Sequence, residues 1–124
     1  MILIIGGAYQ GKLTYAKAAL GVEDKDVFTC QGTQIDFRKR CVRNLEEFSF
    51  ACVQAGLDPK AYLEEHREQW KDTIFLCRDI FCGVVPVDPE VRQWRQITGW
   101  MCQYLAGEAQ SVFRMFCGLE QKLK

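Results

Sequence analysis

The sequence predicts an α/β protein: a three-layer fold in which a small, mostly parallel sheet is flanked by helices and carries a phosphate-binding loop (P-loop). Three observations predict it. Short apolar runs alternate with segments of helical periodicity. Glycines and Asp-Pro pairs separate these segments. The glycine-rich stretch GGAYQGKL directly follows the first apolar run, and 124 residues leave room for one domain, residues 1–124.

The predicted elements of the first part of the chain are a strand, a helix and a second strand. Met1–Ile5 is continuously apolar, which is typical of a strand buried on both faces of a parallel sheet. Residues 12–20 have a helical pattern, and Gly21 is a natural C-terminal cap. Residues 27–30 predict a short strand, and residues 31–41 predict a loop or an irregular crossover because their polarity is mixed.

Three further helices are predicted, at residues 45–55, 59–70 and 89–107. Asn44 is placed to cap the first of them, and Gly56 ends it. The Asp-Pro pairs at 58–59 and 88–89 supply a cap followed by proline at the first helical position of the other two.

Two more strands complete the alternation. Residues 73–78 (TIFLCR) are apolar up to their charged end, and residues 111–117 (SVFRMFC) precede Gly118. Strands that alternate with helices imply parallel pairing, with the helices lying on the faces of the sheet.

The composition is that of an ordinary soluble globular protein. Apolar residues make up 48% and charged residues 26%, and 16 basic side chains balance 16 acidic ones. A net charge of zero argues against a nucleic acid held through its phosphates. The opening apolar run is too short for a signal peptide or a membrane span, so we expect a cytoplasmic protein without a membrane span.

The glycine-rich stretch fits the pattern G-x-x-x-x-G-K through Gly6, Gly11 and Lys12. Glycines let the backbone curl so that successive N–H groups point inward, towards the positive end of the following helix. Lys12 would reach the β- and γ-phosphates of ATP or GTP and is a candidate catalytic residue. The alternative is a strand that ends in glycines beside a solvated lysine. The candidate nucleotide-binding residues are Gly6, Gly7, Ala8, Tyr9, Gln10, Gly11, Lys12, Leu13 and Thr14.

The case for magnesium is weakened by Leu13, which stands where the pattern has a Ser or Thr that ligates the metal. Thr14 has a hydroxyl, but one helical residue rotates the side chain by about 100°, away from the metal. Asp79 follows the apolar run 73–78, at the end of a strand where open α/β sheets place their ligands. We predict Asp79 as the metal ligand and second catalytic residue; the alternative is an aspartate that caps a loop.

Seven cysteines occur, an odd number without a C-x-x-C motif, and most lie in apolar stretches. We therefore expect buried, reduced thiols. Cys77 and Cys82 flank a loop, so a redox or metal role remains open there. Because His66 is the single histidine, no zinc site is predicted. The cysteines are Cys30, Cys41, Cys52, Cys77, Cys82, Cys102 and Cys117.

Three stretches, IIGGAYQGKLTYAK, RDIFCGVVPVD and RQWRQITGWMCQYLAGEAQSVFRMFCGLEQKLK, together carry a family resemblance. They resemble the adenosylcobinamide kinase / adenosylcobinamide-phosphate guanylyltransferase family of cobalamin assembly. The resemblance covers the first twenty residues and the last fifty well, and the middle poorly. The matching residues are Gly6, Gly7, Gly11, Lys12, Gly83, Val85, Pro86, Arg92, Arg95, Gly99, Gln103, Leu105, Ala106, Gly118 and Leu119.

The chain departs from the family pattern at several positions. Arg78 and Asp79 stand for Asn-Glu, Phe81 for a glycine and Cys102 for an asparagine, in addition to Leu13 for serine. The chain is shorter than full-length members, and the missing part in the family carries the histidine that accepts a guanylyl group. His66 is the one candidate here, and it falls in a predicted helix, which favours packing over nucleophilic catalysis.

The resemblance implies ATP- or GTP-dependent phosphoryl transfer to a cobinamide-like alcohol, with guanylyl transfer in doubt. It also implies a homo-oligomer, a purine nucleotide as partner and a corrinoid such as cobinamide as acceptor. Two other hypotheses stay open. One is a nucleotide-binding or regulatory homologue that has lost catalysis. The other is a structural relative whose exposed aromatic face, with Trp94 and Trp100, mediates assembly.

Overall fold

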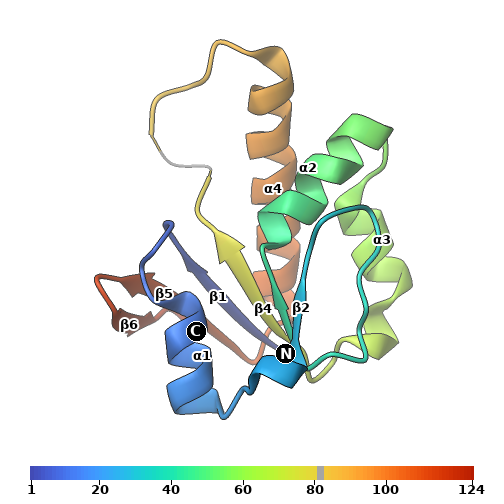
Figure 1. The fold of residues 1–124 in the computed structure, drawn as a ribbon. Helices are drawn as coiled ribbons and strands as arrows, with labels where there is room; N and C mark the ends of the chain where they lie inside the picture. The colour runs from blue at the N-terminus through green and yellow to red at the C-terminus, as the bar shows by residue number, and fades with distance from the viewer. Residues whose placement is uncertain (81–82) are drawn as a thin grey trace.

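The computed structural model describes residues 1–80 and 83–124 and confirms the predicted fold class. Over that range four α-helices flank a six-stranded sheet with the order β2-β3-β4-β1-β5-β6 (Figure 1). The strands are β1 (Ile2–Gly6), β2 (Val27–Thr29), β3 (Cys41–Arg43), β4 (Ile74–Arg78), β5 (Ser111–Phe116) and β6 (Leu119–Lys122). The helices are α1 (Lys12–Leu20), α2 (Leu45–Ala55), α3 (Pro59–Glu65) and α4 (Pro89–Glu108).

Strand β1 lies at the centre of the sheet, parallel to β4 on one side and to β5 on the other. Pairs β2–β3 and β3–β4 are also parallel, and β6 pairs antiparallel with β5. The carboxyl ends of β1 and β4 therefore lie side by side, which places the loops that follow them at the same edge of the sheet.

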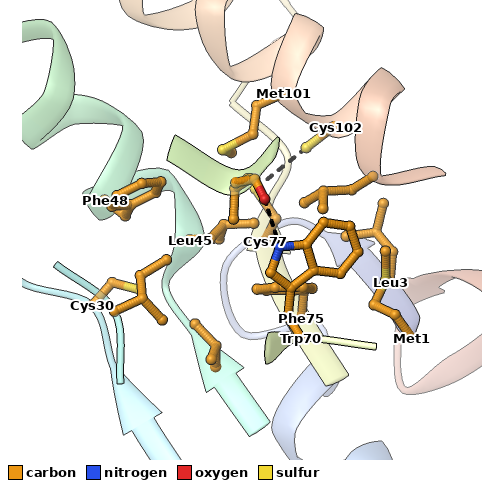
Figure 2. Packing of buried hydrophobic residues seen from close by; sticks show 14 of the residues in the cluster. Met1, Leu3, Cys30, Leu45, Phe48, Trp70, Phe75, Cys77, Met101 and Cys102 are labelled. Carbon is orange, nitrogen blue, oxygen red and sulfur yellow. Dashed lines mark hydrogen bonds between the residues drawn. The ribbon is translucent and has the colours of Figure 1, made fainter. Parts of the chain in front are cut away.

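The two faces of the sheet are covered by different helices, which gives the three predicted layers. Along β1, Leu3 packs with residues of α2, α3 and α4, and Ile4 packs on the opposite face with Ala16 of α1. Figure 2 shows the larger cluster, where Phe48 of α2 and Met101 of α4 lie over Phe75 of β4.

The cysteine prediction is confirmed for five of the residues that the structure describes, since Cys30, Cys41, Cys52, Cys77 and Cys102 are buried free thiols. Burial raises the pKa of Cys30 to about 12. It raises the pKa values of Cys41 and Cys52 to about 11. These thiols are therefore poor nucleophiles.

Two cysteines stand apart from that group. Cys117 is exposed, in the turn between β5 and β6, so it does not belong to the core. Cys82, for which a redox or metal role was open, lies outside the described residues, as does Phe81.

Two strands differ from the prediction. Residues 31–41 were expected to be a loop, but Cys41 begins β3, a three-residue strand in the charged segment RKRCVR. Its burial comes from pairing between β2 and β4, so no long apolar run is needed. Strand β6 was not predicted, because all its residues are exposed and its pairing with β5 depends on the tight turn at Cys117 and Gly118, both with positive φ.

The third helix is also shorter than the predicted range 59–70. Helix α3 ends at Glu65, and a 3₁₀ turn, Arg67–Gln69, follows it. Buried Trp70 turns back onto the helix, where its indole Nε1 donates a hydrogen bond to Leu63 O at 2.8 Å. That contact favours a change of direction after α3 over its continuation.

The helix start signals are confirmed at two of three positions. The carboxylates of Asp58 and Asp88 accept hydrogen bonds from the N–H groups of Lys60 and Glu90, as expected for caps before proline. Asn44 precedes α2 in a left-handed conformation, and its side chain makes no capping hydrogen bond. None of the helices in the described part of the chain has the length and apolarity that a membrane crossing requires.

Candidate functional site

The glycine-rich loop connects the end of β1 at Gly6 to the start of α1 at Lys12, at the carboxyl edge of the sheet (Figure 1). Gly11 is the N-cap of α1 and has a φ of 95°, which favours glycine. The first turn of α1 contains no acidic residue. The loop therefore leads directly into the positive end of a nine-residue helix, as the phosphate-loop pattern requires.

Close packing explains why two positions of the loop, Gly6 and Gly11, are occupied by glycine. A Cβ on Gly6 would lie 2.7 Å from the backbone oxygen of Met115 in β5, closer than carbon and oxygen can approach without displacement. A Cβ on Gly11 would lie 3.3 Å from the Cα of Gly118, in the turn between β5 and β6. The loop is thus pressed against the next strand and its turn, and a side chain at either position would push it away.

Gln10 ties the loop to the same turn. Its side-chain oxygen Oε1 accepts a hydrogen bond from the N–H of Cys117 at 2.6 Å. Its backbone oxygen accepts one from the N–H of Gly118 at 3.1 Å. The loop is therefore positioned by residues near the other end of the chain, through a turn that the sequence did not indicate.

Lys12 lies folded over the loop. Its Nζ donates hydrogen bonds to Gly6 O at 3.0 Å and Gly7 O at 2.7 Å. Partial burial lowers the pKa of Lys12, and the negative charge of Glu46 acts in the opposite direction. The lysine is thus an ammonium group that loop carbonyls hold beside the backbone of the loop.

A pocket of about 340 Å³ opens beside this loop. Its cationic groups are Lys12, Arg43 from β3 and Arg78 from β4, and its acidic groups are Glu46 and Glu47 from α2. Three cations beside a helix N-terminus suit a polyanion such as a triphosphate. The full lining is Ala8, Tyr9, Gln10, Gly11, Lys12, Leu13, Thr14, Arg43, Asn44, Glu46, Glu47, Leu76 and Arg78.

The structure brings most of the predicted nucleotide-binding residues together. Residues 8–14 line the pocket, and the backbone oxygens of Gly6 and Gly7 accept hydrogen bonds from Lys12. Leu13 also packs against the apolar cluster under α1, and Thr14 is exposed. Whether these residues bind a nucleotide is a prediction that binding measurements must test.

Asp79 lies where the sequence predicted, directly after β4 and next to the loop. Its N–H donates a hydrogen bond to Gly6 O at 2.9 Å, and the residue is half-buried. It does not line the pocket. Among the residues with described positions, no group of three or more His, Cys, Asp or Glu side chains is arranged to hold a metal ion. Magnesium nevertheless needs few protein ligands when phosphates and waters supply the rest, and one carboxylate fits that minimal role.

Sequence reasoning missed five polar residues of the pocket: Arg43, Asn44, Glu46, Glu47 and Arg78. Arg43 belongs to the strand that was not predicted. Glu46 is buried, whereas its neighbour Glu47 is exposed, yet both occupy the first turn of α2 in the sequence LEEF. Periodicity alone does not separate them, because the burial of Glu46 depends on how α2 meets β4.

His66 is not inside a helix, as predicted, but at the C-cap of α3. Its ring stacks on Tyr62 with centroids 4.2 Å apart and lies 5.7 Å from Phe37. Its Nδ1 is 2.7 Å from Tyr62 O. The histidine thus packs among aromatic rings, and it is not part of the pocket lining.

Trp94 and Trp100 were expected on an exposed aromatic face, and this prediction is wrong for Trp94. Trp94 is half-buried, stacks edge-on against Phe50 and donates from Nε1 to Glu46 O at 2.9 Å and Ser49 Oγ at 3.1 Å. Trp100 is 54% exposed. Trp94 therefore belongs to the packing between α2 and α4.

Comparison with known proteins adds one match. A family model described as cobinamide kinase / cobinamide phosphate guanyltransferase matches residues 41–123, more than half of the chain. The matched part includes β3, α2, β4, α4 and the β5–β6 turn, and it begins after the glycine-rich loop. No curated protein matches the chain.

Proposed function

The chain belongs to the cobinamide kinase / cobinamide phosphate guanyltransferase family, and on that premise we propose that it binds a purine triphosphate in the pocket beside Lys12. Membership supports a kinase- or guanyltransferase-type function in cobalamin assembly. We further propose that the terminal phosphoryl group of the nucleotide is transferred to the alcohol of a cobinamide-like corrinoid.

The observation that carries this proposal is the arrangement of cations around the loop. Lys12, Arg43 and Arg78 line one pocket with the loop backbone at the N-terminus of α1, although they come from three different elements. Phosphoryl transfer needs little covalent chemistry from the protein, because positioning and charge neutralisation provide most of the catalysis.

Lys12 would change partners when the nucleotide binds. Its Nζ would exchange the carbonyls of Gly6 and Gly7 for phosphate oxygens, which are stronger charge-assisted acceptors. In the reaction the alcohol oxygen bonds to the γ-phosphorus as the bond to the bridging oxygen breaks. The nucleoside diphosphate leaves, and the proton of the alcohol passes to water.

Asp79 is the residue that would hold magnesium. A bound magnesium ion would neutralise charge on the phosphates and orient them. With Leu13 in place of the usual hydroxyl, Asp79 would supply one carboxylate from beside the loop, and the remaining ligands would be phosphate oxygens and waters. We do not propose guanylyl transfer, because His66 packs against Tyr62 away from the pocket lining.

Leu13 favours a second candidate function. A chain that binds nucleotide but lacks the metal-binding hydroxyl could serve as a nucleotide-binding or regulatory homologue without catalysis. Incubation with cobinamide, ATP or GTP and magnesium, followed by mass spectrometry of the corrinoid, separates the two. The kinase proposal predicts cobinamide phosphate that is absent with Lys12→Ala. Nucleotide binding without this product would favour the second function and contradict the first.

A further inference from the structure

We propose that Glu46 is a positioning residue of this pocket, whose buried carboxylate supplies the counter-charge that keeps Lys12 an ammonium group ready for phosphate. The inference rests on the proposed function, in which Lys12 contacts the nucleotide. Glu46 acts through Lys12 and through the wall of the pocket, and it does not itself act on the substrate.

The burial of Glu46 is unusual for a charged side chain. Glu46 is 4% exposed, and among the residues that the structure describes it is the one charged side chain that is fully buried. Burying an unpaired carboxylate is strongly unfavourable, because the charge loses its hydration. The surroundings must therefore compensate the charge.

Two elements compensate this charge, and a third helps to fix the residue. Glu46 lies in the first turn of α2, where the helix dipole favours an anion. Its Oε2 accepts a hydrogen bond from the N–H of Arg78, the last residue of β4, at 3.0 Å. Its backbone oxygen accepts hydrogen bonds from Trp94 Nε1 of α4 at 2.9 Å and Ser49 Oγ at 2.9 Å. The carboxylate is thus held in one place at the edge of the pocket.

The charges around Lys12 show why a buried anion matters there. Arg43 of β3, Arg78 of β4 and Glu46 of α2 line the same pocket as the lysine. The nearby Cys77 thiol of β4 is hydrogen-bonded to Cys102 and buried, which raises its pKa and leaves it uncharged at neutral pH. Burial and the two arginines lower the pKa of Lys12, and Glu46 is the strongest influence that raises it. Without Glu46, Lys12 would lose its proton at a lower pH, and a neutral amine is a poor ligand for phosphate.

Glu46 also repels the phosphates that Lys12 attracts, so a neutral residue at position 46 has two opposite effects. Below the pKa of Lys12, Glu46→Gln removes repulsion and leaves the ammonium in place, so triphosphate affinity is maintained or increased. At alkaline pH the variant loses affinity earlier than the wild type. If Glu46 had only a structural role, Glu46→Gln would weaken triphosphate binding at every pH. It would not change the pH at which affinity falls in the alkaline range.

The decisive experiment measures the pKa of Lys12 by NMR in the nucleotide-free protein, with its side-chain signal identified by its loss in Lys12→Arg. Glu46→Gln should shift the titration of Lys12 to lower pH, because the amide can still accept the hydrogen bond from Arg78 but carries no charge. Glu47→Gln is the matched control, since Glu47 is the exposed neighbour in the same turn, and it should leave the titration unchanged. Glu46→Asp keeps the negative charge, so the pKa of Lys12 in this variant should stay close to its wild-type value.

An unchanged Lys12 titration in Glu46→Gln would overturn the inference, as would an equal shift in Glu47→Gln. If Glu46→Gln does not fold, Glu46→Met decides in its place, because methionine has a similar size and carries no charge. A Lys12 titration at lower pH than in Glu47→Gln supports the inference, and one equal to that of Glu47→Gln contradicts it. Calorimetry with magnesium-free ATP between neutral and alkaline pH tests the nucleotide step. A wild type that binds neither ATP nor GTP would contradict the proposed function, while the NMR titration still decides the role of Glu46.

Discussion

At the residue scale, Leu13 limits magnesium binding in the pocket, because it lacks the hydroxyl that would ligate the metal. Leu13→Ser should add a hydroxyl in the first turn of α1, at a propensity cost of only a few tenths of a kcal/mol. We expect magnesium to tighten ATP or GTP binding to the variant by about 1 kcal/mol more than to the wild type. Calorimetry with and without magnesium measures this difference. An equal response of both proteins would mean that Thr14, Asp79 or water already completes the metal site.

His66 gives a second prediction at this scale. Because its ring stacks on Tyr62 and its Nδ1 lies 2.7 Å from the Tyr62 oxygen, we expect no covalent guanylyl adduct after incubation with GTP and magnesium. Intact-mass spectrometry tests this directly. A mass increase of one GMP that disappears in His66→Ala would show that guanylyl transfer occurs after all.

The positions of candidate site residues were predictable where local pattern determines them. Lys12 and the glycines follow from the loop motif, and the position of Asp79 beside Gly6 follows from adjacent parallel strand ends. Glu46 was not predictable, because the same turn contains an exposed glutamate and only the approach of Arg78 distinguishes the two. Such residues depend on contacts between elements far apart in the sequence.

At the scale of elements, alanine should have opposite effects at two glycines. One is Gly6, where the loop contacts β5, and the other is Gly99, inside α4. Gly6→Ala would place a Cβ 2.7 Å from a backbone oxygen, which cannot move as a side chain can. We expect a loss of stability of about 1–3 kcal/mol, the usual cost of overpacking. Chemical denaturation measures it.

Gly99→Ala is the matched control, because Gly99 lies inside α4 and its added Cβ would meet no atom within 4 Å. Alanine is the better helix former, so this variant should gain about 0.5–1 kcal/mol. Equal stabilities of Gly6→Ala and the wild type would mean that the loop does not pack tightly against β5.

The elements with strong local signals were the ones that could be predicted. Helices α1 and α4 and strands β1 and β4 agree with prediction to within about a residue, because apolar runs, proline starts and glycine ends define them. Strands β3 and β6 are short and polar, and they exist because neighbouring strands supply their hydrogen bonds. Sequence patterns within such segments carry little information about that pairing.

At the scale of the whole molecule, we expect a homo-oligomer. Strands β2 and β6 form the edges of the sheet, and near β6 the side chains of Phe116, Leu119 and Leu123 are more than half exposed. Light scattering at micromolar concentration measures the assembled mass. A monomeric mass would contradict this expectation, and Leu119→Lys, which places a charge on the edge, would then behave like the wild type.

The fold class was predictable because it depends on the alternation of apolar runs and helical segments along the whole chain, which tolerates errors in single elements. The order of the strands was not predictable in the same way. The hairpin of β5 and β6 places Cys117 and Gly118 against Gln10, and this long-range contact helps to position the loop.

We propose that the glycine-rich loop binds a purine triphosphate through Lys12. Isothermal titration calorimetry with magnesium-free ATP and GTP tests it most directly, on the wild type, Lys12→Ala and Lys17→Ala. Lys17 is the control because it lies on the same helix, is exposed and pairs with Asp24. We predict that Lys12→Ala weakens binding by about 2–3 kcal/mol, roughly 30- to 150-fold, while Lys17→Ala binds like the wild type. Equal affinities of Lys12→Ala and the wild type, or no binding by the wild type, would show that the loop does not bind a triphosphate through Lys12.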